Sequence, residues 1–216
     1  MKMQEYLEVK DFTYRQYCDY LQEKYGIGLA DYMTKSFNKN QKASRTNDGL
    51  IAHHKYEDVM IMLSLKEVAE ICPFEWQKAE NIVYCDYLEH LLLHILICKY
   101  PSPDALDILS VGYGGVVNYL VPELNDLYSG WITKQAWRKK CHDLVIDDKD
   151  VYLELIKQFI EIQGLDKYTI DVIKTSFNQE FGLWNTKNNR ELYSIFDGFV
   201  NNNNSKRGLL GRLLKK

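Results

Sequence analysis

The stretch GLIAHH at residues 49–54, followed by ENIVYCDYLEHLLLH at residues 80–94, decides the fold. The first piece is short and apolar and ends in two histidines, which is typical of a strand or strand end. The second begins with another brief apolar step at residues 82–84, which also indicates a strand. Asp86 then caps a helix whose apolar residues recur at helical spacing until Pro101. We therefore expect two strands and a helix in close succession.

Helical periodicity dominates the rest of the chain. Residues 36–49 are rich in Asn, Lys and Ser and predict a loop, whereas residues 59–72 predict either a helix or an irregular insertion. Further helices are expected within residues 6–32, 103–120, 122–128, 134–145, 151–163, 168–181 and 190–200. The predicted fold class is mainly α with a small α+β core, in which a central ββα unit is flanked by helical segments.

The chain is expected to divide into four segments. These are an N-terminal helical and basic-loop segment (1–48), the ββα core (49–100), a C-terminal helical region (101–200) and a basic flexible tail (201–216). The length of 216 residues suits one domain or two small ones.

Composition excludes several classes of protein. Hydrophobic residues make up 46% and charged residues 26%, which is ordinary for a globular chain and not for a disordered or fibrous one. No run of apolar residues is long enough for a membrane span, and the charged N-terminus does not resemble a signal peptide. The five cysteines form no CxxC pair, which argues against a disulfide framework and favours a reducing cytoplasm.

Charge is distributed unevenly along the chain. The net charge is −3, and removing the five basic residues of the tail leaves −8 for residues 1–200. Such an acidic body is no general polyanion binder, so a nucleic acid would need local basic stretches. Two stretches are visible, and each is either a solvated face or a contact for a phosphate backbone. Their cations are Lys35, Lys39, Lys42 and Arg45 in the first, and Lys134, Arg138, Lys139 and Lys140 in the second.

Histidine is scarce, yet four of the five histidines lie within 42 positions: His53, His54, His90 and His94. On a helix, the spacing of His90 and His94 puts both imidazoles on one face, about 6 Å apart at Cβ, which suits two ligands of one metal ion. The alternative is a helix that buries two hydrogen-bonded histidines among its leucines.

Competing motifs are weaker. A metalloprotease helix carries HExxH, but Leu91 follows His90 here, so the essential glutamate is missing. Cys85 has no partner cysteine for a structural zinc site and is expected to be a buried thiol. The GYGG at residues 112–115 lacks the remaining glycine and lysine of phosphate-binding loops and predicts a turn or a close helix contact.

The two quoted stretches resemble the core of the HNH, or ββα-metal, nucleases. The likeness is strongest to the branch that includes bacterial toxin DNases, in which a double histidine is followed by Asn-x(8)-His-x(3)-His. Asn81 and His90 are nine positions apart, and His90 and His94 are four apart. The resemblance covers roughly residues 49–98.

The resemblance implies a role for each residue of the motif. His53, His90 and His94 would bind one divalent metal ion, and His54 would be the general base that deprotonates the attacking water. Asn81 would hydrogen-bond across the loop and hold the strand–helix unit in position. The ion could be Mg²⁺, Zn²⁺, Ni²⁺ or Mn²⁺. Three imidazoles favour zinc, nickel and similar ions, whereas the family resemblance keeps Mg²⁺ as a candidate.

The chain departs from the family pattern at two places. Ile51 stands where an acidic residue often precedes the first histidine, and 27 positions separate His54 from Asn81, which predicts an insertion. Glu57 and Asp58 follow the histidine pair and are either partners that orient an imidazole or surface acids.

Two functions are therefore carried forward. The first is a cytoplasmic metal-dependent HNH endonuclease that hydrolyses phosphodiester bonds in nucleic acid, with DNA as the expected substrate and a protein partner bound through the helical C-terminal region. The second is a non-catalytic interaction or inhibitor protein that keeps the HNH fold. Its acidic surface would mimic nucleic acid in a conflict between phage or mobile elements and their hosts.

Overall fold

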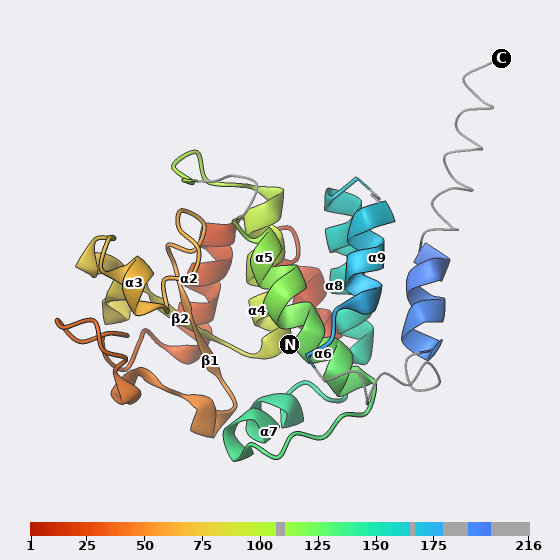
Figure 1. The fold of residues 1–216 in the computed structure, drawn as a ribbon, viewed down its shortest axis with the longest axis horizontal. Helices are drawn as coiled ribbons and strands as arrows, with labels where there is room; N and C mark the ends of the chain where they lie inside the picture. The colour runs from red at the N-terminus through yellow and green to blue at the C-terminus, as the bar shows by residue number, and fades with distance from the viewer. Residues whose placement is uncertain (107–110, 165–166, 179–189, 200–216) are drawn as a thin grey trace.

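The computed structural model describes residues 1–106, 111–164, 167–178 and 190–199 (Figure 1). The predicted tail, residues 201–216, lies outside the described residues, as do residues 179–181 at the end of one predicted helix. The described part is mainly helical with one small antiparallel sheet, as the sequence predicts.

The central unit consists of two strands and one helix. β1 (Ile51–His54) pairs antiparallel with β2 (Ile82–Cys85) in a register that sets His53 opposite Val83. α4 (Tyr87–Lys99) follows β2 after the single residue Asp86. Both predicted strands and the predicted helix are confirmed.

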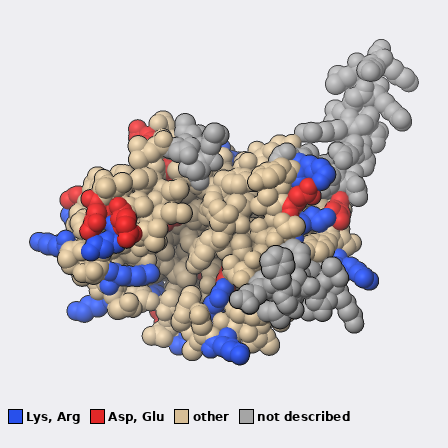
Figure 2. All heavy atoms as spheres, viewed as in Figure 1, with Lys and Arg blue, Asp and Glu red and all other residues tan. Residues whose placement is uncertain are grey.

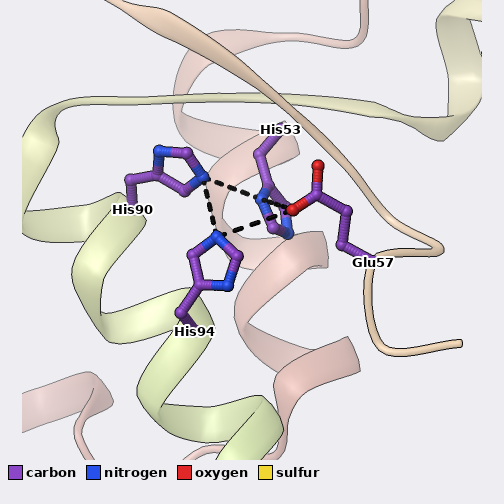
Figure 3. A group of neighbouring side chains, drawn as sticks. All are labelled: His53, Glu57, His90 and His94. Carbon is purple, nitrogen blue, oxygen red and sulfur yellow. Dashed lines mark hydrogen bonds and ion pairs between the residues drawn. The ribbon is translucent and has the colours of Figure 1, made fainter. Parts of the chain in front are cut away.

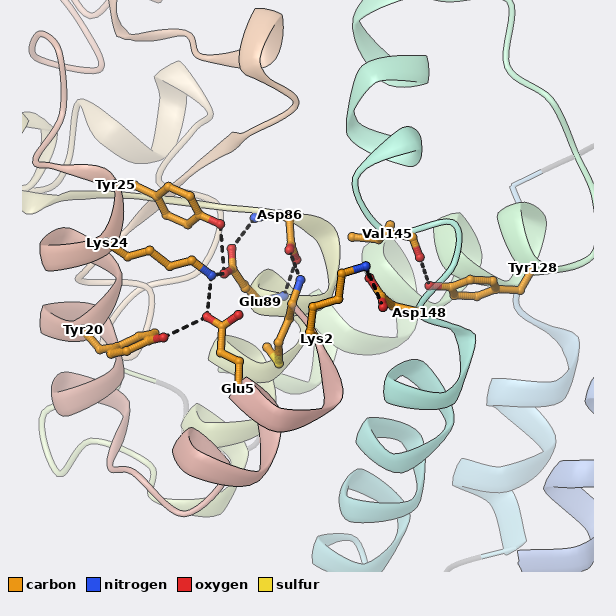
Figure 4. A network of polar contacts seen from close by, with 11 residues as sticks. Lys2, Glu5, Tyr20, Lys24, Tyr25, Asp86, Glu89, Tyr128, Val145 and Asp148 are labelled. Atoms are coloured by element: carbon orange, nitrogen blue, oxygen red, sulfur yellow. Dashed lines mark hydrogen bonds and ion pairs between the residues drawn. The ribbon is translucent and has the colours of Figure 1, made fainter.

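The start of α4 is fixed by a network of polar contacts (Figure 4). The Asp86 carboxylate accepts a hydrogen bond from the Glu89 N–H, and Glu89 accepts one from the Asp86 N–H, forming a capping box. Lys24 donates to both Glu89 and Glu5, and the Tyr25 hydroxyl also donates to Glu89. Because these groups come from α1 (Met3–Val9) and α2 (Tyr14–Tyr25), the network ties the N-terminal helices to α4.

α4 is the centre of the hydrophobic core. Every residue from Tyr87 to Ile97 is buried, so the helix is enclosed on all sides instead of presenting one apolar stripe. It contacts α2 on one side, and α5 (Tyr113–Gly115) and α8 (Lys149–Ile162) elsewhere (Figure 1). Buried residues from the N-terminal, central and C-terminal segments therefore share one core.

The remaining elements surround this unit. They are α3 (Lys66–Ala69), a π-helical turn (Val116–Leu120), α6 (Val121–Tyr128), α7 (Ala136–Asp143), α9 (Lys167–Thr175), a helix over residues 190–199, and the 3₁₀ turns η1 (Gln41–Ala43), η2 (Thr46–Asp48), η3 (Phe74–Gln77) and η4 (Ala79–Asn81). None of the helices in the described segments is long and apolar enough to cross a bilayer.

One predicted helix, over residues 103–120, is wrong at its start. Residues 103–106 are not helical, residues 107–110 lie outside the described part, and helix begins only at Tyr113. Pro101 and Pro103 lack the N–H groups that a helix needs, and Gly112 has a φ of +78°, outside the helical region. The insertion between the histidine pair and Asn81 is irregular, with α3 as a single helical turn.

Candidate metal centre

Four side chains converge beneath the surface: His53, Glu57, His90 and His94 (Figure 3). One potential ligand atom from each lies within 4.8 Å of all the others. The Nε2 of His90 lies 3.0 Å from Nδ1 of His53 and 3.1 Å from Nε2 of His94. A Glu57 carboxylate oxygen lies 3.6 Å from His53 Nδ1 and 3.5 Å from His94 Nε2. These four residues could hold a metal ion.

The secondary structure explains why these residues meet. His90 and His94 lie one turn apart on α4 and therefore share a face. Adjacent residues of a strand point to opposite faces, so His53 contacts the α4 histidines whereas His54 contacts Tyr32 and Gln77 on the other side. Glu57 comes from the turn that follows β1.

Tyr14 holds the His53 ring in a useful orientation. Its hydroxyl oxygen lies 2.8 Å from His53 Nε2, and the hydroxyl donates to the backbone carbonyls of His54 or Lys55 at 3.2 Å. If the hydroxyl proton goes to one of these carbonyls, the Nε2–H of His53 donates to the Tyr14 oxygen. In that tautomer His53 Nδ1 is unprotonated and faces the other three ligand atoms, and Tyr14 is the kind of outer-shell partner that metal-bound histidines have.

Burial keeps the imidazoles neutral. It lowers the pKa of His53 to about 3, and it lowers those of His90 and His94, although Glu57 opposes each shift. The pKa of Glu57 is also low: burial acts to raise it, but the neighbouring imidazoles lower it more. Neutral imidazoles and a carboxylate are the protonation states that bind a metal ion.

The donor set fits a divalent transition metal. Three imidazole nitrogens and one carboxylate oxygen suit zinc or nickel better than Mg²⁺, which prefers oxygen ligands. The Nδ1 atoms of His90 and His94 are buried without a hydrogen-bond partner among the described residues. Three imidazole nitrogens point at one another, and two facing nitrogens can share a hydrogen bond only if one of them carries the proton. A cation at their centre would use all three lone pairs.

The GYGG segment forms a wall against His94. A Cβ atom placed on Gly115 would lie 2.3 Å from the ring of His94, and one on Gly112 would meet the backbone of α4. The predicted close helix contact is therefore confirmed. Gly114, between them, has ordinary space, with its nearest neighbour 3.7 Å away.

A cavity of about 710 Å³ opens onto the cluster. Glu57, His90 and His94 line it, whereas His53 lies behind them, fully buried. The rest of its lining includes residues 112–115, Asn118, Tyr119, Tyr32 and Lys39. On the face drawn in Figure 2, the surface is hollowed near its centre among uncharged residues, and the charged side chains gather toward the edges.

Two residues with predicted roles lie outside the cluster. His54 is 1% exposed and does not line the cavity; its Nε2 is 3.1 Å from Gln77 Oε1, and its Nδ1 is 3.6 Å from Glu57. The Asn81 side chain donates to the Glu75 carbonyl at 2.8 Å, and its own carbonyl accepts from the Lys55 N–H. The general-base role of His54 stays a prediction. Glu57, whose carboxylate lies near His54, does line the cavity.

The two basic stretches are neighbours in space, because α7 packs on η2 and Lys140 donates to Asn47. Several of their cations are engaged internally. Arg45 donates to the Tyr25 carbonyl and pairs with Asp48, and Lys139 pairs with Asp143.

Arg138 stacks on Trp131 and binds the buried carboxylate of Glu123, which also accepts from His142. Lys39 lines the cavity, with its ammonium 5.1 Å from the Tyr32 ring centre.

Sequence reasoning missed part of the site. Glu57 is a potential ligand, beyond the two roles considered for it, whereas Asp58 pairs with Arg15. The spacing of four between His53 and Glu57 was the available signal. Nothing in the local sequence pointed to Tyr14, which lies 39 positions from His53. Cys85 is a buried thiol as predicted, and burial raises its pKa.

No family model, curated protein or solved structure matches this chain.

Gly115→Ala should weaken metal binding, because the added methyl group must displace the His94 ring. We expect the dissociation constant for Zn²⁺ to rise about 10- to 100-fold, the range found when groups that support metal ligands are disturbed. Calorimetric titration of the metal-free protein measures it. Gly114→Ala is the matched control, and equal affinities for the two variants would contradict the prediction.

Tyr14→Phe should also raise the Zn²⁺ dissociation constant about 10-fold or more, because His53 loses the acceptor that fixes its tautomer. Tyr17, one turn further along α2, is a suitable control because its buried hydroxyl has no hydrogen-bond partner among the described residues. Tyr17→Phe should leave the dissociation constant unchanged. The same titration checks both variants. A dissociation constant of Tyr14→Phe equal to that of wild type would refute the role of the hydroxyl.

Metal-free protein should lose stability at the site as the pH falls from 7 to 5. The unfolded histidines titrate near pH 6.5 while the folded ones stay neutral, so the unfolded state binds more protons in this window. His53, with a folded pKa of about 3, then contributes a loss of about 2 kcal/mol, and the lowered pKa values of His90 and His94 add to the loss in the same direction. The pKa of Glu89, raised to about 7 by burial and Asp86, acts in the opposite sense.

The histidine contribution is isolated by comparing wild type with His94→Asn. Urea unfolding in EDTA at pH 7 and pH 5 should show a smaller acid-induced loss in the variant, by about 1 kcal/mol. Identical losses in the two proteins would show that His94 is not buried in its neutral form.

Proposed function

We propose that this protein is a metal-dependent phosphodiester hydrolase, a nuclease of the ββα-metal type. The observation that supports this most directly is the convergence of His53 from β1 with His90 and His94 from α4 at the floor of a cavity. A strand histidine and two helix histidines one turn apart are the ligand arrangement that the resemblance to HNH nucleases implies.

A divalent ion bound here would neutralise charge on the phosphate and the leaving oxygen. The chain's own residues supply the rest. His53, His90 and His94 would bind the ion, and Tyr14 would keep the His53 ring in its binding tautomer. Water attacks phosphorus, its oxygen forms a new P–O bond, and the bond to the leaving oxygen breaks; that oxygen takes a proton from solvent water. The proton of that water goes to the Glu57–His54 pair, in which Glu57 faces the cavity and His54 lies behind it.

A specific contact favours a second candidate function. Because a Glu57 carboxylate oxygen lies 3.6 Å from His53 Nδ1 and 3.5 Å from His94 Nε2, it can take a fourth position in the coordination shell. A shell closed by four protein ligands is typical of structural metal sites. The protein would then be a non-catalytic interaction protein that keeps the metal for stability.

Purified protein should cut nucleic acid when Mn²⁺, Ni²⁺, Zn²⁺ or Mg²⁺ is added and not in EDTA. The substrates are supercoiled plasmid, single-stranded circular DNA and RNA. His90→Ala should abolish cutting and metal binding, whereas His54→Ala and Glu57→Gln should each slow cutting about 100-fold or more while the fold persists. Glu67→Gln, an exposed acid on α3, is the control for Glu57→Gln.

The two candidate functions give different results. A folded, metal-binding protein that cuts none of the three substrates with any of the four ions would exclude the nuclease and favour the structural site. In that case His54→Ala would leave partner binding intact, while loss of His90 and His94 would destabilise the core.

A further inference from the structure

The cavity above the metal centre points to the class of nucleic acid that enters it. We propose that it takes one unpaired nucleotide of a single-stranded polynucleotide, with the base stacked on Tyr119 and a phosphate near Lys39. This inference rests on the proposed function, since the cavity is the access to the metal ligands.

The size of the cavity favours a single nucleotide. Its volume of about 710 Å³ lies within the range of 300–1,000 Å³ that encloses a ligand the size of a nucleotide. Enzymes that act within such a pocket use single-stranded substrate or extrude one nucleotide from the duplex. His90 and His94 line the cavity but are each only 6% exposed, so a duplex resting on the surface would not bring its backbone to them.

The walls offer stacking surfaces. Tyr119 is 44% exposed, and its ring centre lies 5.8 Å from that of His90 at an angle of 70°. One side of the Tyr119 ring therefore borders the ligand cluster, while the ring remains accessible from the cavity. Tyr113 and Tyr32 also line the cavity. Aromatic rings of this kind bind unpaired bases without regard to sequence.

The π-helical turn is what places these groups. Pro122 has no N–H to give to the carbonyl of Asn118, and the chain is π-helical over Val116–Leu120. Asn118 and Tyr119 are the two exposed residues of this turn, and both line the cavity. The Asn118 amide can hydrogen-bond the edge of a base that is not paired.

The charge of the cavity argues against a duplex. Lys39 is the one Lys or Arg among the described residues that line it, and Glu57 is the one acid. Binding to duplex DNA usually depends on several phosphate contacts at once. A single cation suits one phosphate, with the binding energy coming largely from stacking.

Binding is measured without cutting, in EDTA, by fluorescence anisotropy of labelled 12-mers: single-stranded DNA, single-stranded RNA and a DNA duplex. We expect at least 10-fold tighter binding of a single strand than of the duplex. Tyr119→Ala should weaken single-strand binding about 5- to 150-fold, the effect of losing one stacked base, and Tyr119→Phe should retain it. Asn118→Ala provides a second exposed position if Tyr119→Ala disturbs the fold.

Lys39 is tested by salt. Lys39→Ala should lower the slope of log Kd against log salt concentration by about 0.7, the value for one phosphate of a single strand. Lys35→Ala is the matched control, because Lys35 is exposed but does not line the cavity.

The outcomes separate this inference from the proposed function. Duplex binding equal to or tighter than single-strand binding, no binding of either, or an unaltered Tyr119→Ala would overturn the inference. Metal-dependent cutting of plasmid could still stand in each case. Tight single-strand binding that is lost in Tyr119→Ala would support the inference even if no metal produced cutting. Comparing single-stranded DNA with single-stranded RNA shows whether deoxyribose or ribose is preferred.

Discussion

Every other element of the core is arranged around the completely buried helix α4. All residues from Tyr87 to Ile97 are buried, so the helix must be covered on every side by other elements. That requirement recruits α1, α2, α8 and the segment after Gly112 into one core. The same burial removes water from His90 and His94, which lowers their pKa values and makes them neutral ligands.

The candidate metal centre and the capping network stabilise the same helix at different points. At its N-terminus, Asp86 and Glu89 satisfy the backbone and bind cations and hydroxyls from α1 and α2. His90, the residue after Glu89, contacts His53 from β1. The sheet is only two strands wide and gains little stability from itself. Its position relative to α4 therefore depends on these cross-links and on the packing of α2 against β2.

The cavity brings together parts of the chain with very different composition. The first basic stretch contributes Lys39, the turn after β1 contributes Glu57, and the GYGG segment packs its glycines against α4. Only glycine permits the approach of residue 115 to His94, since any side chain would occupy the space of the imidazole. A motif that resembles a phosphate loop thus packs closely against α4 and lines the cavity beside the candidate metal ligands.

The local elements could be predicted from the residues alone: Ile51–His54 and Ile82–Cys85 as strands, the Asp86-capped helix, and the face shared by His90 and His94. Their periodicity and capping are properties of neighbouring residues, so they can be read without a fold. Only the tertiary structure decided that Tyr14 would orient His53, that Glu57 would turn inward, and that His54 would face Gln77. These contacts join residues whose separation along the chain carries no periodic signal, and they follow from how α2 and the irregular insertion pack around a buried α4.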